Sequence, residues 1–378
     1  MKANIFIAGA GGIGQAAALI LAESEFLNVT LYLGDISTTA IQNSTAFIQH
    51  GATKPVSIHG VVMTDDDTDP TLVSALESCQ IILDCLPGSQ APRLARLAKK
   101  FGCHYANLTE YVAETQEIQK IAEGADTAFV LQTGLAPGFI NILACQLYKE
   151  FSRDFGVEIV DEMAMKVGAL SMHAPSPHFY AFTWSPIGVA TEYLKDAEVV
   201  VDFQKQLVPA LSRCEEIVID GEVYEDNFTS GGAADLPDAF AGKVKNLHYK
   251  TLRHPKHYAW VESTLQTLQH EANKIQSLEK IMLDQIASVE DDFVIVYAAV
   301  QGKDSQGRLR RKEKAYKILP SKVGNQMLRA IQTTTAAPLC EMAYMMLQGN
   351  MKGVVLQSQI DSEIFLNGPF VKSIYGGY

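Results

Sequence analysis

The chain has 378 residues and a mass of 41.3 kDa, enough for about two domains with cores of their own. Hydrophobic residues make up 47% and charged residues 20%, a globular composition that argues against disorder, collagen-like repeats and coiled coil. The net charge of −12 disfavours nucleic acid or an anionic membrane as a partner. No apolar run approaches the roughly 18 residues that a membrane span needs.

The first 14 residues include a basic Lys2 and an apolar stretch, but they lack a small-residue cleavage pattern, so we expect no signal peptide. Six cysteines are scattered without paired spacing, which indicates neither a disulfide framework nor a zinc site. This cysteine usage predicts a cytoplasmic protein. His173 and His178 lack metal-ligand spacing and no HExxH is present, so we expect no metal.

The first 130 residues alternate between apolar runs typical of buried strands and stretches typical of helices. The expected strands are 3–8, 28–33, 56–63, 81–86, 104–108 and 128–132. The expected helices among them are 14–23, 38–49 and 69–77. This alternation predicts a Rossmann-type, doubly wound parallel sheet, which is an α/β fold.

The middle of the chain changes character, because hairpin signals replace this alternation. We expect a long strand at 157–167, a hairpin around Asp220-Gly221, and a second hairpin formed by 293–300 and 308–318. Antiparallel pairs of this kind predict a separate α+β domain with an antiparallel sheet. A helix is expected over 326–347. The basic residues of the last strand suit a solvated face or a protected edge strand better than a ligand site: Arg308, Arg310, Arg311, Lys312 and Lys314.

A glycine-rich motif, G-x-G-x-x-G, follows the first expected strand and opens a helix, which is the context that dinucleotide binding requires. Its first glycine permits a tight turn, its second lets the backbone approach a pyrophosphate, and its third lets helix and strand pack closely. The alternative is a tight turn without a ligand. We expect the cofactor phosphates at the helix N-terminus, against Gly9, Gly11, Gly12, Ile13 and Gly14.

Asp35 ends the next strand and is expected to accept hydrogen bonds from the adenosine ribose hydroxyls. A 2′-phosphate would meet this carboxylate, and Ile36 to Thr38 supply no arginine, so NAD is favoured over NADP. Asp65 or Asp66 follows the third strand and could reach the adenine amino group; an ordinary polar loop is the alternative reading.

Two further segments follow strands at the carboxyl edge of the sheet, where ligands of open α/β sheets bind. Cys85, Leu86 and Pro87 are expected to line the nicotinamide ribose; a nucleophilic Cys85 is a weaker alternative, since nothing basic lies beside it in sequence. Thr109 and Glu110 follow the next strand and should face the same cleft.

Several longer motifs resemble the saccharopine dehydrogenase-like family, over nearly the whole chain. Residues 134–141 (GLAPGFIN) resemble its GLAPG-x-x-N turn, and residues 182–188 (FTWSPIG) resemble its F-S-W-S-P-x-G segment. Residues 229–232 (TSGG) and 249–257 (YKTLRHPKH) are similar to segments of its lysine 6-dehydrogenase branch. Lys256, Ala169 and Ser171 depart from the branch pattern, which leaves the substrate open.

The resemblance implies NAD(P)-linked oxidation of an amine, a homodimer, and a cofactor domain completed by the end of the chain. We therefore expect residues 1–150 and 326–378 to form the dinucleotide-binding domain, and residues 151–325 to form a substrate-binding and dimerisation domain.

An amine dehydrogenase that acts on an amino acid needs a cation for the carboxylate and a group that accepts a proton. Arg253 is expected to clamp the carboxylate in a bidentate fork, with a structural ion pair as the alternative. His257 could serve as the base or be structural. Glu110 could bind or deprotonate the substrate ammonium, or be a solvated carboxylate. Thr109 is a further substrate-binding candidate. Tyr180 and Trp184 could wall the aliphatic part of the substrate or belong to the core.

Three functions remain open at this point. The first is an NAD-dependent dehydrogenase acting on the C–NH bond of an amino acid such as lysine or saccharopine. The second is a synthase of the same fold that condenses an amine with a carbonyl compound and reduces the imine, as in polyamine or opine-like synthesis. The third is a non-enzymatic NAD-binding protein.

Overall fold

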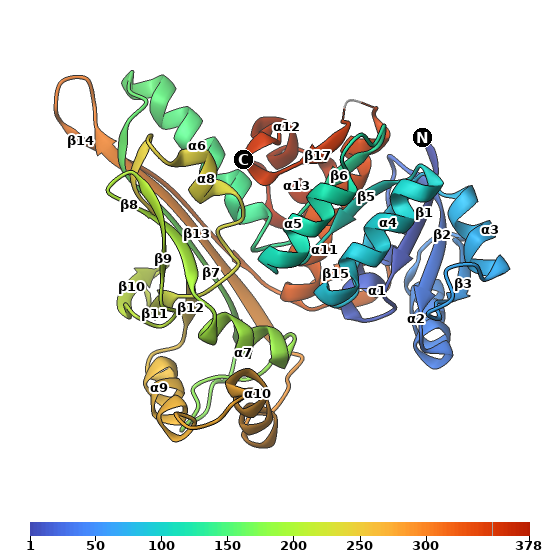
Figure 1. Cartoon of the computed structure of the whole chain (residues 1–378), viewed down its shortest axis with the longest axis horizontal. Helices are drawn as coiled ribbons and strands as arrows, with labels where there is room; N and C mark the ends of the chain where they lie inside the picture. The colour runs from blue at the N-terminus through green and yellow to red at the C-terminus, as the bar shows by residue number, and fades with distance from the viewer. Residues whose placement is uncertain (350) are drawn as a thin grey trace. The chain divides into compact units, whose positions relative to one another are not determined.

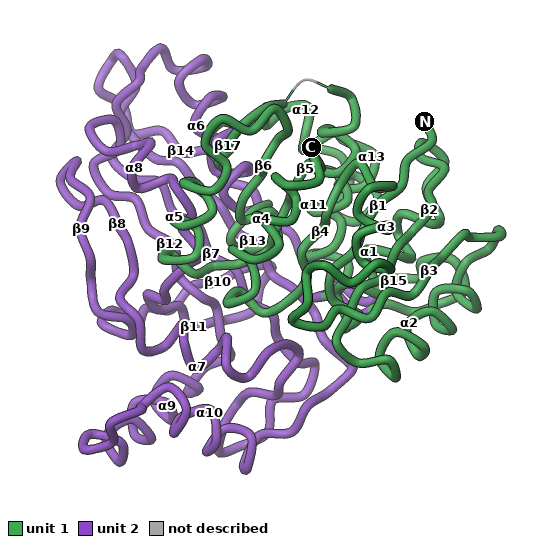
Figure 2. The backbone as a smooth tube through the Cα atoms, turned by 45° about the vertical axis from the view of Figure 1, so that its right-hand side comes forward, with its two compact units in different colours: residues 1–139, 321–328, 332–378 green, residues 140–320, 329–331 purple. Residues whose placement is uncertain are grey.

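The computed structural model describes residues 1–349 and 351–378, which form two compact units (Figures 1 and 2). Unit 1 comprises residues 1–139, 321–328 and 332–378, and unit 2 comprises residues 140–320 and 329–331. Unit 1 is therefore discontinuous in sequence. The predicted division into a dinucleotide-binding domain (residues 1–150 and 326–378) and a substrate-binding and dimerisation domain (residues 151–325) stays a prediction.

Unit 1 is built on a seven-stranded parallel sheet in the order β17-β6-β5-β4-β1-β2-β3. Its strands are β1 (Lys2–Ala8), β2 (Asn28–Asp35), β3 (Ser57–Val62), β4 (Ile81–Asp84), β5 (His104–Asn107), β6 (Ala128–Val130) and β17 (Gly353–Val355). The strand order reverses between β1 and β4, so the carboxyl ends of these two strands flank the topological switch point where such sheets bind ligands.

Helices follow most strands of this sheet, and a small hairpin and four short helical segments complete the unit as described. The helices are α1 (Gly12–Ala22), α2 (Thr38–Gly51), α3 (Pro70–Ser78), α4 (Ala91–Phe101), α5 (Val112–Ile121) and α11 (Ala330–Leu347, in unit 1 from residue 332). The other elements are η1 (Gly88–Gln90), β15 (Ser321–Val323), β16 (Gln326–Leu328), η2 (Gln357–Gln359), α12 (Ser362–Leu366) and α13 (Pro369–Tyr375).

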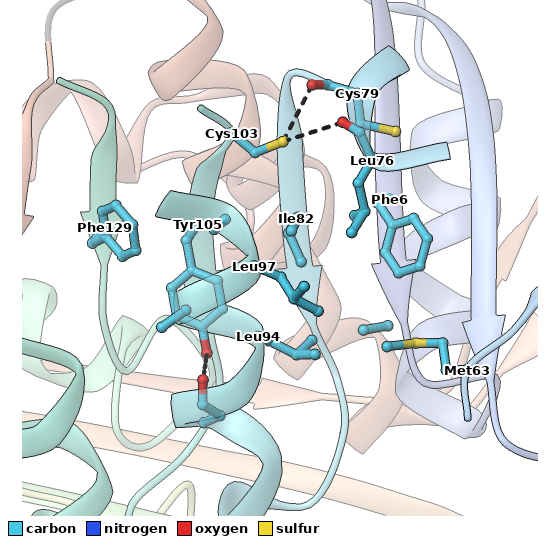
Figure 3. Close-up of a cluster of buried hydrophobic side chains, with 14 of the residues drawn as sticks. Phe6, Met63, Leu76, Cys79, Ile82, Leu94, Leu97, Cys103, Tyr105 and Phe129 are labelled. Atoms are coloured by element: carbon cyan, nitrogen blue, oxygen red, sulfur yellow. Dashed lines mark hydrogen bonds between the residues drawn. The ribbon is translucent and has the colours of Figure 1, made fainter. Parts of the chain in front are cut away.

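One face of this sheet forms a core with α3, α4 and α5 (Figure 3). Phe129, Tyr105, Ile82 and Phe6 come from four neighbouring strands and are at most 1% exposed. Leucines of α4 pack over them. This row of large apolar side chains fixes which side of the sheet α4 covers, and with it the path of the loop between β4 and α4.

Unit 2 contains an eight-stranded sheet whose main path is β10-β11-β12-β7-β13-β14, with β8 paired to β12 and β9 to β8. Its strands are β7 (Val160–Ser171), β8 (Ala197–Val201), β9 (Gln204–Val208), β10 (Glu215–Ile219), β11 (Glu222–Phe228), β12 (Val244–Arg253), β13 (Asp292–Lys303) and β14 (Leu309–Ile318). Its helices are α6 (Phe139–Phe155, in unit 2 from residue 140), α7 (Pro186–Leu194), α8 (Leu236–Phe240), α9 (His257–Thr267) and α10 (Lys274–Gln285).

The helices α7, α9 and α10 form a separate apolar cluster at one end of unit 2, together with the segment that precedes α7. Tyr180, Tyr193, Tyr258 and Leu278 lie in this cluster and are at most 2% exposed. In Figure 1 the three helices lie together below the long strands. Arg253 is the last residue of β12 and His257 the first of α9, so the chain enters this cluster directly from the sheet.

The predicted fold class is confirmed: a Rossmann-type parallel sheet and a second α+β part. Three details differ. The sheet of unit 2 is mixed, because β12 and β7 pair in parallel. The expected helix at 326–347 begins at Ala330, after β16, and the expected strand 81–86 ends at Asp84. Both predicted hairpins are present, and β14 with its basic residues is an edge strand.

Candidate functional site

The glycine turn after β1 has the shape that a dinucleotide phosphate group needs. A Cβ on Gly9 (φ +108°) would lie 2.8 Å from the Cys85 carbonyl oxygen, and one on Gly14 would lie 1.9 Å from the Gly9 oxygen. A Cβ on Gly11 would meet nothing within 4 Å. The first and third glycines are thus required by protein packing, whereas the second leaves open space beside the N-terminus of α1. That space fits the approach of a pyrophosphate.

Asp35 ends β2 next to this turn. One carboxylate oxygen accepts a hydrogen bond from Ala10 N at 2.9 Å, and the other accepts from Ser37 N at 2.9 Å. Ser37 in turn caps α2 by accepting from Ala40 N. Asp35 therefore helps to shape the glycine turn, and its remaining lone pairs are available for ribose hydroxyls.

The loop after β3 is exposed, and it contains Asp65 and Asp66. Hydrogen bonds from Thr68 to Asp66 lower the pKa of that carboxyl. Asp67, which the sequence did not single out, binds Arg93 of α4 at 2.7 Å. The adenine contact predicted for Asp65 or Asp66 stays a prediction.

The loop after β4 lies directly against the glycine turn, as the short approach between Gly9 and Cys85 shows. Cys85 and Leu86 are half-buried and Pro87 is exposed. Burial raises the pKa of the Cys85 thiol far above its usual range, which disfavours the nucleophilic alternative. Thr109 lies beside this loop, because a Cβ on Gly88 would lie 2.2 Å from its hydroxyl oxygen. Glu110 follows it and is half-buried.

A buried acid that sequence reasoning missed lies under the same loop. Asp84, the last residue of β4, is 2% exposed and accepts hydrogen bonds from Leu86 N at 3.0 Å and from the Tyr105 hydroxyl at 2.7 Å. Burial raises the pKa of the Asp84 carboxyl to about 7. Its signal in the sequence is an aspartate within the apolar run IILDCL.

In unit 2, the motifs that support the family resemblance converge. Asn141 of the GLAPG-x-x-N turn donates to the Gly232 carbonyl oxygen at 3.0 Å, and a Cβ on Gly232 would lie 2.3 Å from the Tyr249 ring. The hydroxyls of Thr229 and Thr251 are 2.6 Å apart. Segments far apart in sequence are thus bound together around the carboxyl end of β12.

Arg253, at that end, is 1% exposed. Its Nε donates to the Tyr193 hydroxyl at 2.7 Å and its Nη1 to the Leu252 carbonyl oxygen at 3.0 Å. Its Nη2 makes no hydrogen bond within the described chain, and the nearest carboxylate oxygen, on Glu192, is 3.8 Å away. Two nitrogens of the expected fork therefore donate to protein groups, and Nη2 is buried within ion-pair distance of Glu192. The carboxylate clamp stays a prediction, with the structural ion pair as its alternative.

The Tyr193 hydroxyl links Arg253 to His257. It lies 3.0 Å from His257 Nε2, while His257 Nδ1 lies 2.7 Å from the carbonyl oxygen of His178. A carbonyl oxygen can only accept, so Nδ1 carries the proton, and Nε2 accepts from Tyr193. Burial and the Arg253 charge lower the pKa of His257 to about 3, so this imidazole is neutral at neutral pH.

The predicted aromatic walls lie in the same cluster. The Tyr180 ring packs on Arg253 (5.1 Å from Cζ to the ring centroid) and on the His257 imidazole (4.8 Å between centroids). Trp184 is half-buried, and its indole lies where a Cβ on Gly188 would be. Tyr193 was missed, because nothing in its sequence neighbourhood distinguishes it from a core tyrosine. Unit 2 thus brings together Tyr180, Trp184, Arg253 and His257, whereas the predicted cofactor residues, Thr109 and Glu110 belong to unit 1.

Within residues 1–349 and 351–378, no group of three or more His, Cys, Asp or Glu side chains is arranged to hold a metal ion. No helix in this part of the chain is both long and apolar enough to cross a membrane.

The parallel sheet with its glycine turn defines a dinucleotide-binding oxidoreductase fold. More particularly, the chain belongs to the saccharopine dehydrogenase family. The family model of the saccharopine dehydrogenase NADP binding domain matches residues 5–130, and that of the saccharopine dehydrogenase C-terminal domain matches residues 134–373. The resemblance stated from the motifs is thereby confirmed.

Among curated proteins, the chain is similar to the mitochondrial alpha-aminoadipic semialdehyde synthase of Mus musculus, with 22% identity over 203 residues. The match covers 53% of this chain and 21% of that protein. The same synthase of Rattus norvegicus matches with 22% identity over 202 residues, again 53% of this chain and 21% of that protein. The chain thus spans about a fifth of the length of these relatives.

Among solved structures, the apo saccharopine dehydrogenase (L-Glu forming) of Saccharomyces cerevisiae superposes with a TM-score of 0.75 at 14% identity, covering 98% of this chain and 96% of that one. The homospermidine synthase of Legionella pneumophila, in complex with NAD, gives 0.67 at 14% identity, covering 100% and 91%. At these identities the likeness shows a shared fold.

Proposed function

We propose that this protein is an NAD-dependent dehydrogenase that oxidises the C–NH bond of an amino acid such as lysine or saccharopine. The observation that carries the proposal is Arg253, a buried guanidinium whose Nη2 has no hydrogen-bond partner within the described chain. A buried cation with unused donors is costly unless a ligand satisfies them, and a carboxylate is the anion that a guanidinium binds best.

Unit 1 supports the cofactor part of this proposal. The space beside Gly11 and the N-terminus of α1 suits a pyrophosphate, and Asp35 lies at the end of β2 as a fixed acceptor for ribose hydroxyls. A carboxylate at this position repels the 2′-phosphate of NADP. We therefore propose NAD(H) as the preferred cofactor, although the matching family model is named for NADP.

When bound, the nicotinamide accepts a hydride from the carbon that bears the amine. In unit 2, Arg253 is proposed to bind the substrate carboxylate through Nη2, and Tyr180 and Trp184 to pack on the aliphatic chain. His257 is retained as a proposed base, but its Nε2 accepts from Tyr193, so a substrate proton would reach it through that hydroxyl. Glu110 in unit 1 is proposed to bind the substrate ammonium or remove its proton.

A second candidate is the reverse chemistry, a synthase that reduces the imine formed from an amine and a carbonyl compound. The superposition on a homospermidine synthase over 100% of this chain favours retaining it. In that case, NADH consumption would require a carbonyl co-substrate. A homodimer, predicted from the family resemblance, is part of either proposal.

The test is the absorbance of NADH, measured over a panel of amino acids, polyamines and keto acids in both directions. We expect NADH formation from NAD and a carboxylate-bearing amine alone. Turnover only when amine, carbonyl compound and NADH are all present would establish the synthase instead. Binding of NAD(H) without turnover on any member of the panel would favour a non-enzymatic role.

A further inference from the structure

Asp84 has surroundings that none of the roles assigned so far explains. Its side chain lies on the α4 side of the sheet, at the switch point between β4 and β1. Its two oxygens have different partners: one accepts from the backbone of its own loop, at Leu86 N, and the other from Tyr105 on β5. No ion pair to Asp84 is found among the described residues, so a carboxylate here is stabilised by neutral donors alone.

The Tyr105 hydroxyl has a second acceptor. Besides Asp84, it lies 3.2 Å from the carbonyl oxygen of Ala91, the first residue of α4. A hydroxyl donates one proton, so Tyr105 can turn to either oxygen. If Asp84 gains a proton, the new carboxyl O–H can donate to the Tyr105 oxygen, and the Tyr105 O–H can then donate to Ala91. Both arrangements leave every group hydrogen-bonded.

The two acceptors of Tyr105 are at opposite ends of the loop formed by residues 85–90. This loop is the one that lies against the glycine turn: Cys85 N donates to Ala8 O at 2.8 Å, and Leu86 N would lie 3.3 Å from a Cβ on Gly9. The hydrogen bond from Leu86 N to Asp84 therefore acts on the wall of the dinucleotide site. It is charge-assisted only while Asp84 is ionised.

We propose that Asp84 is a positioning residue for the dinucleotide: as a carboxylate it holds the 85–90 loop against the glycine turn, and as a carboxylic acid it loosens that loop and weakens dinucleotide binding. The inference rests on the proposed dinucleotide site, and it adds a dependence of cofactor affinity on pH.

The groups that face Asp84 are consistent with a titration near neutral pH. Three other titratable groups lie around Asp84: Tyr105 from β5, Cys85 from the loop itself, and Cys340 of α11, which lies close to Cys85. Burial raises the pKa of all three, so each is neutral at neutral pH. The register places Ala8 of β1 and Asn107 of β5 beside Asp84, and Ala91 is its neighbour from α4. With no cation to oppose it, burial brings the pKa of Asp84 to about 7.

Unit 1 offers a matched control. Glu341 of α11 is also a buried carboxyl, 1% exposed, whose pKa burial raises to about 7. Its oxygen accepts from Phe370 N at 2.8 Å and from Val371 N at 3.3 Å, so it caps α13 and makes no hydrogen bond to the 85–90 loop. Removing its charge should change the stability of the unit and leave the pH dependence of dinucleotide binding as it is.

The experiment is calorimetric titration of the full chain with NAD and with NADH, from about pH 6 to about pH 8.5. For the unmodified protein we expect Kd to rise roughly fivefold toward low pH, since a charge-assisted hydrogen bond is about twice as strong as a neutral one. Asp84→Asn keeps an acceptor for Leu86 N but removes the charge, so this variant should bind the dinucleotide weakly, with a Kd that does not depend on pH. Glu341→Gln should keep the pH dependence of the unmodified protein.

Tyr105→Phe provides a second route if Asp84→Asn does not fold. Without the phenol donor the carboxylate is less stabilised, so the midpoint of the binding transition should move to higher pH. The proposal is overturned if Asp84→Asn follows the unmodified protein at every pH, or if Tyr105→Phe leaves the midpoint unmoved. Absence of dinucleotide binding at any pH would instead refute the proposed function.

Discussion

Arg253 is a buried cation with an incomplete set of partners. Most of the contacts around it are neutral: the Tyr193 hydroxyl, the Leu252 carbonyl oxygen and the face of the Tyr180 ring. Among the described residues, the Glu192 carboxylate forms an ion pair with it at 3.8 Å, which is beyond hydrogen-bond distance. Removing such a cation outright would leave Tyr193 without its donor, so a substitution that keeps the charge separates binding from folding most cleanly.

Arg253→Lys should therefore raise KM for a carboxylate-bearing substrate by roughly tenfold, with kcat little changed, because an ammonium cannot bind Tyr193 and a carboxylate in the geometry of the guanidinium. Steady-state kinetics with a substrate found in the panel would measure this. NADH affinity should stay the same, and Arg310→Lys on the edge strand β14 is the matched control. An unchanged KM would mean that the carboxylate is held elsewhere.

The choice between NAD and NADP can be tested beside Asp35 without disturbing the turn. Ser37 caps α2, whereas Ile36 is 74% exposed. Both Asp35 oxygens accept backbone N–H groups, from Ala10 and Ser37, so the test keeps Asp35. Ile36→Arg adds a cation for a 2′-phosphate, and we expect it to shift the ratio of NAD to NADP affinity by at least about tenfold toward NADP. Ile36→Ala is the control, and tighter binding of NADP than NAD by the unmodified protein would contradict the assignment.

At the scale of single residues, the sequence predicted only part of the candidate site. The glycine motif and Arg253 were found because their residue types are chemically specific and their context was readable. Tyr193 and Asp84 were not, since their roles depend on partners from other elements: Arg253 and His257 for the first, Tyr105 and Leu86 for the second. An aspartate within an apolar run marks position 84 as unusual, but the partners of such hydrogen bonds cannot be read from local sequence.

At the scale of elements, buried strands and glycine turns were predicted well, because apolar runs bounded by helix starts leave few alternatives. The predicted helix 326–347 starts before the observed one, which begins at Ala330. Gln326–Leu328 is as apolar as a first helical turn, but it pairs with β15 as a strand. The parallel pairing of β12 with β7 could not be predicted, because strands far apart in sequence show their direction only in the folded sheet.

The βα turn itself allows a paired prediction. Gly11→Ala places a methyl group in open space, so the free energy of unfolding should stay within about 0.5 kcal/mol of the unmodified protein, while NAD affinity falls at least about tenfold. Gly14→Ala places the methyl group against the Gly9 oxygen and should lower the free energy of unfolding by about 1–3 kcal/mol or more. Thermal unfolding and NAD titration of both variants would check this. Equal effects of the two variants on stability would contradict the assigned roles.

For the whole chain, the end of the sequence is structurally part of unit 1. β17 pairs in parallel with β6, and the Tyr375 ring stacks on Phe139 at 3.6 Å between centroids. Gln357 donates to the Leu131 carbonyl oxygen at 2.6 Å, and the backbone of α13 satisfies Glu341. These contacts place the tail in unit 1; that it completes a cofactor-binding domain stays a prediction from the family resemblance.

A chain that ends at Gly349 should therefore lose more than its last few elements. The edge of β6 would be unpaired, Phe139 would lose its stacking partner, and the buried Glu341 would lose the N–H groups that its oxygen accepts from. Together these losses should exceed about 5 kcal/mol, which is comparable to the stability of a whole domain. We expect loss of NAD binding and of cooperative unfolding of unit 1, measured by titration and calorimetry. A chain ending at Gly376 keeps α13 complete and is the control. Normal NAD binding by the shorter chain would show that the Rossmann sheet folds without the tail, which would contradict the discontinuous cofactor domain.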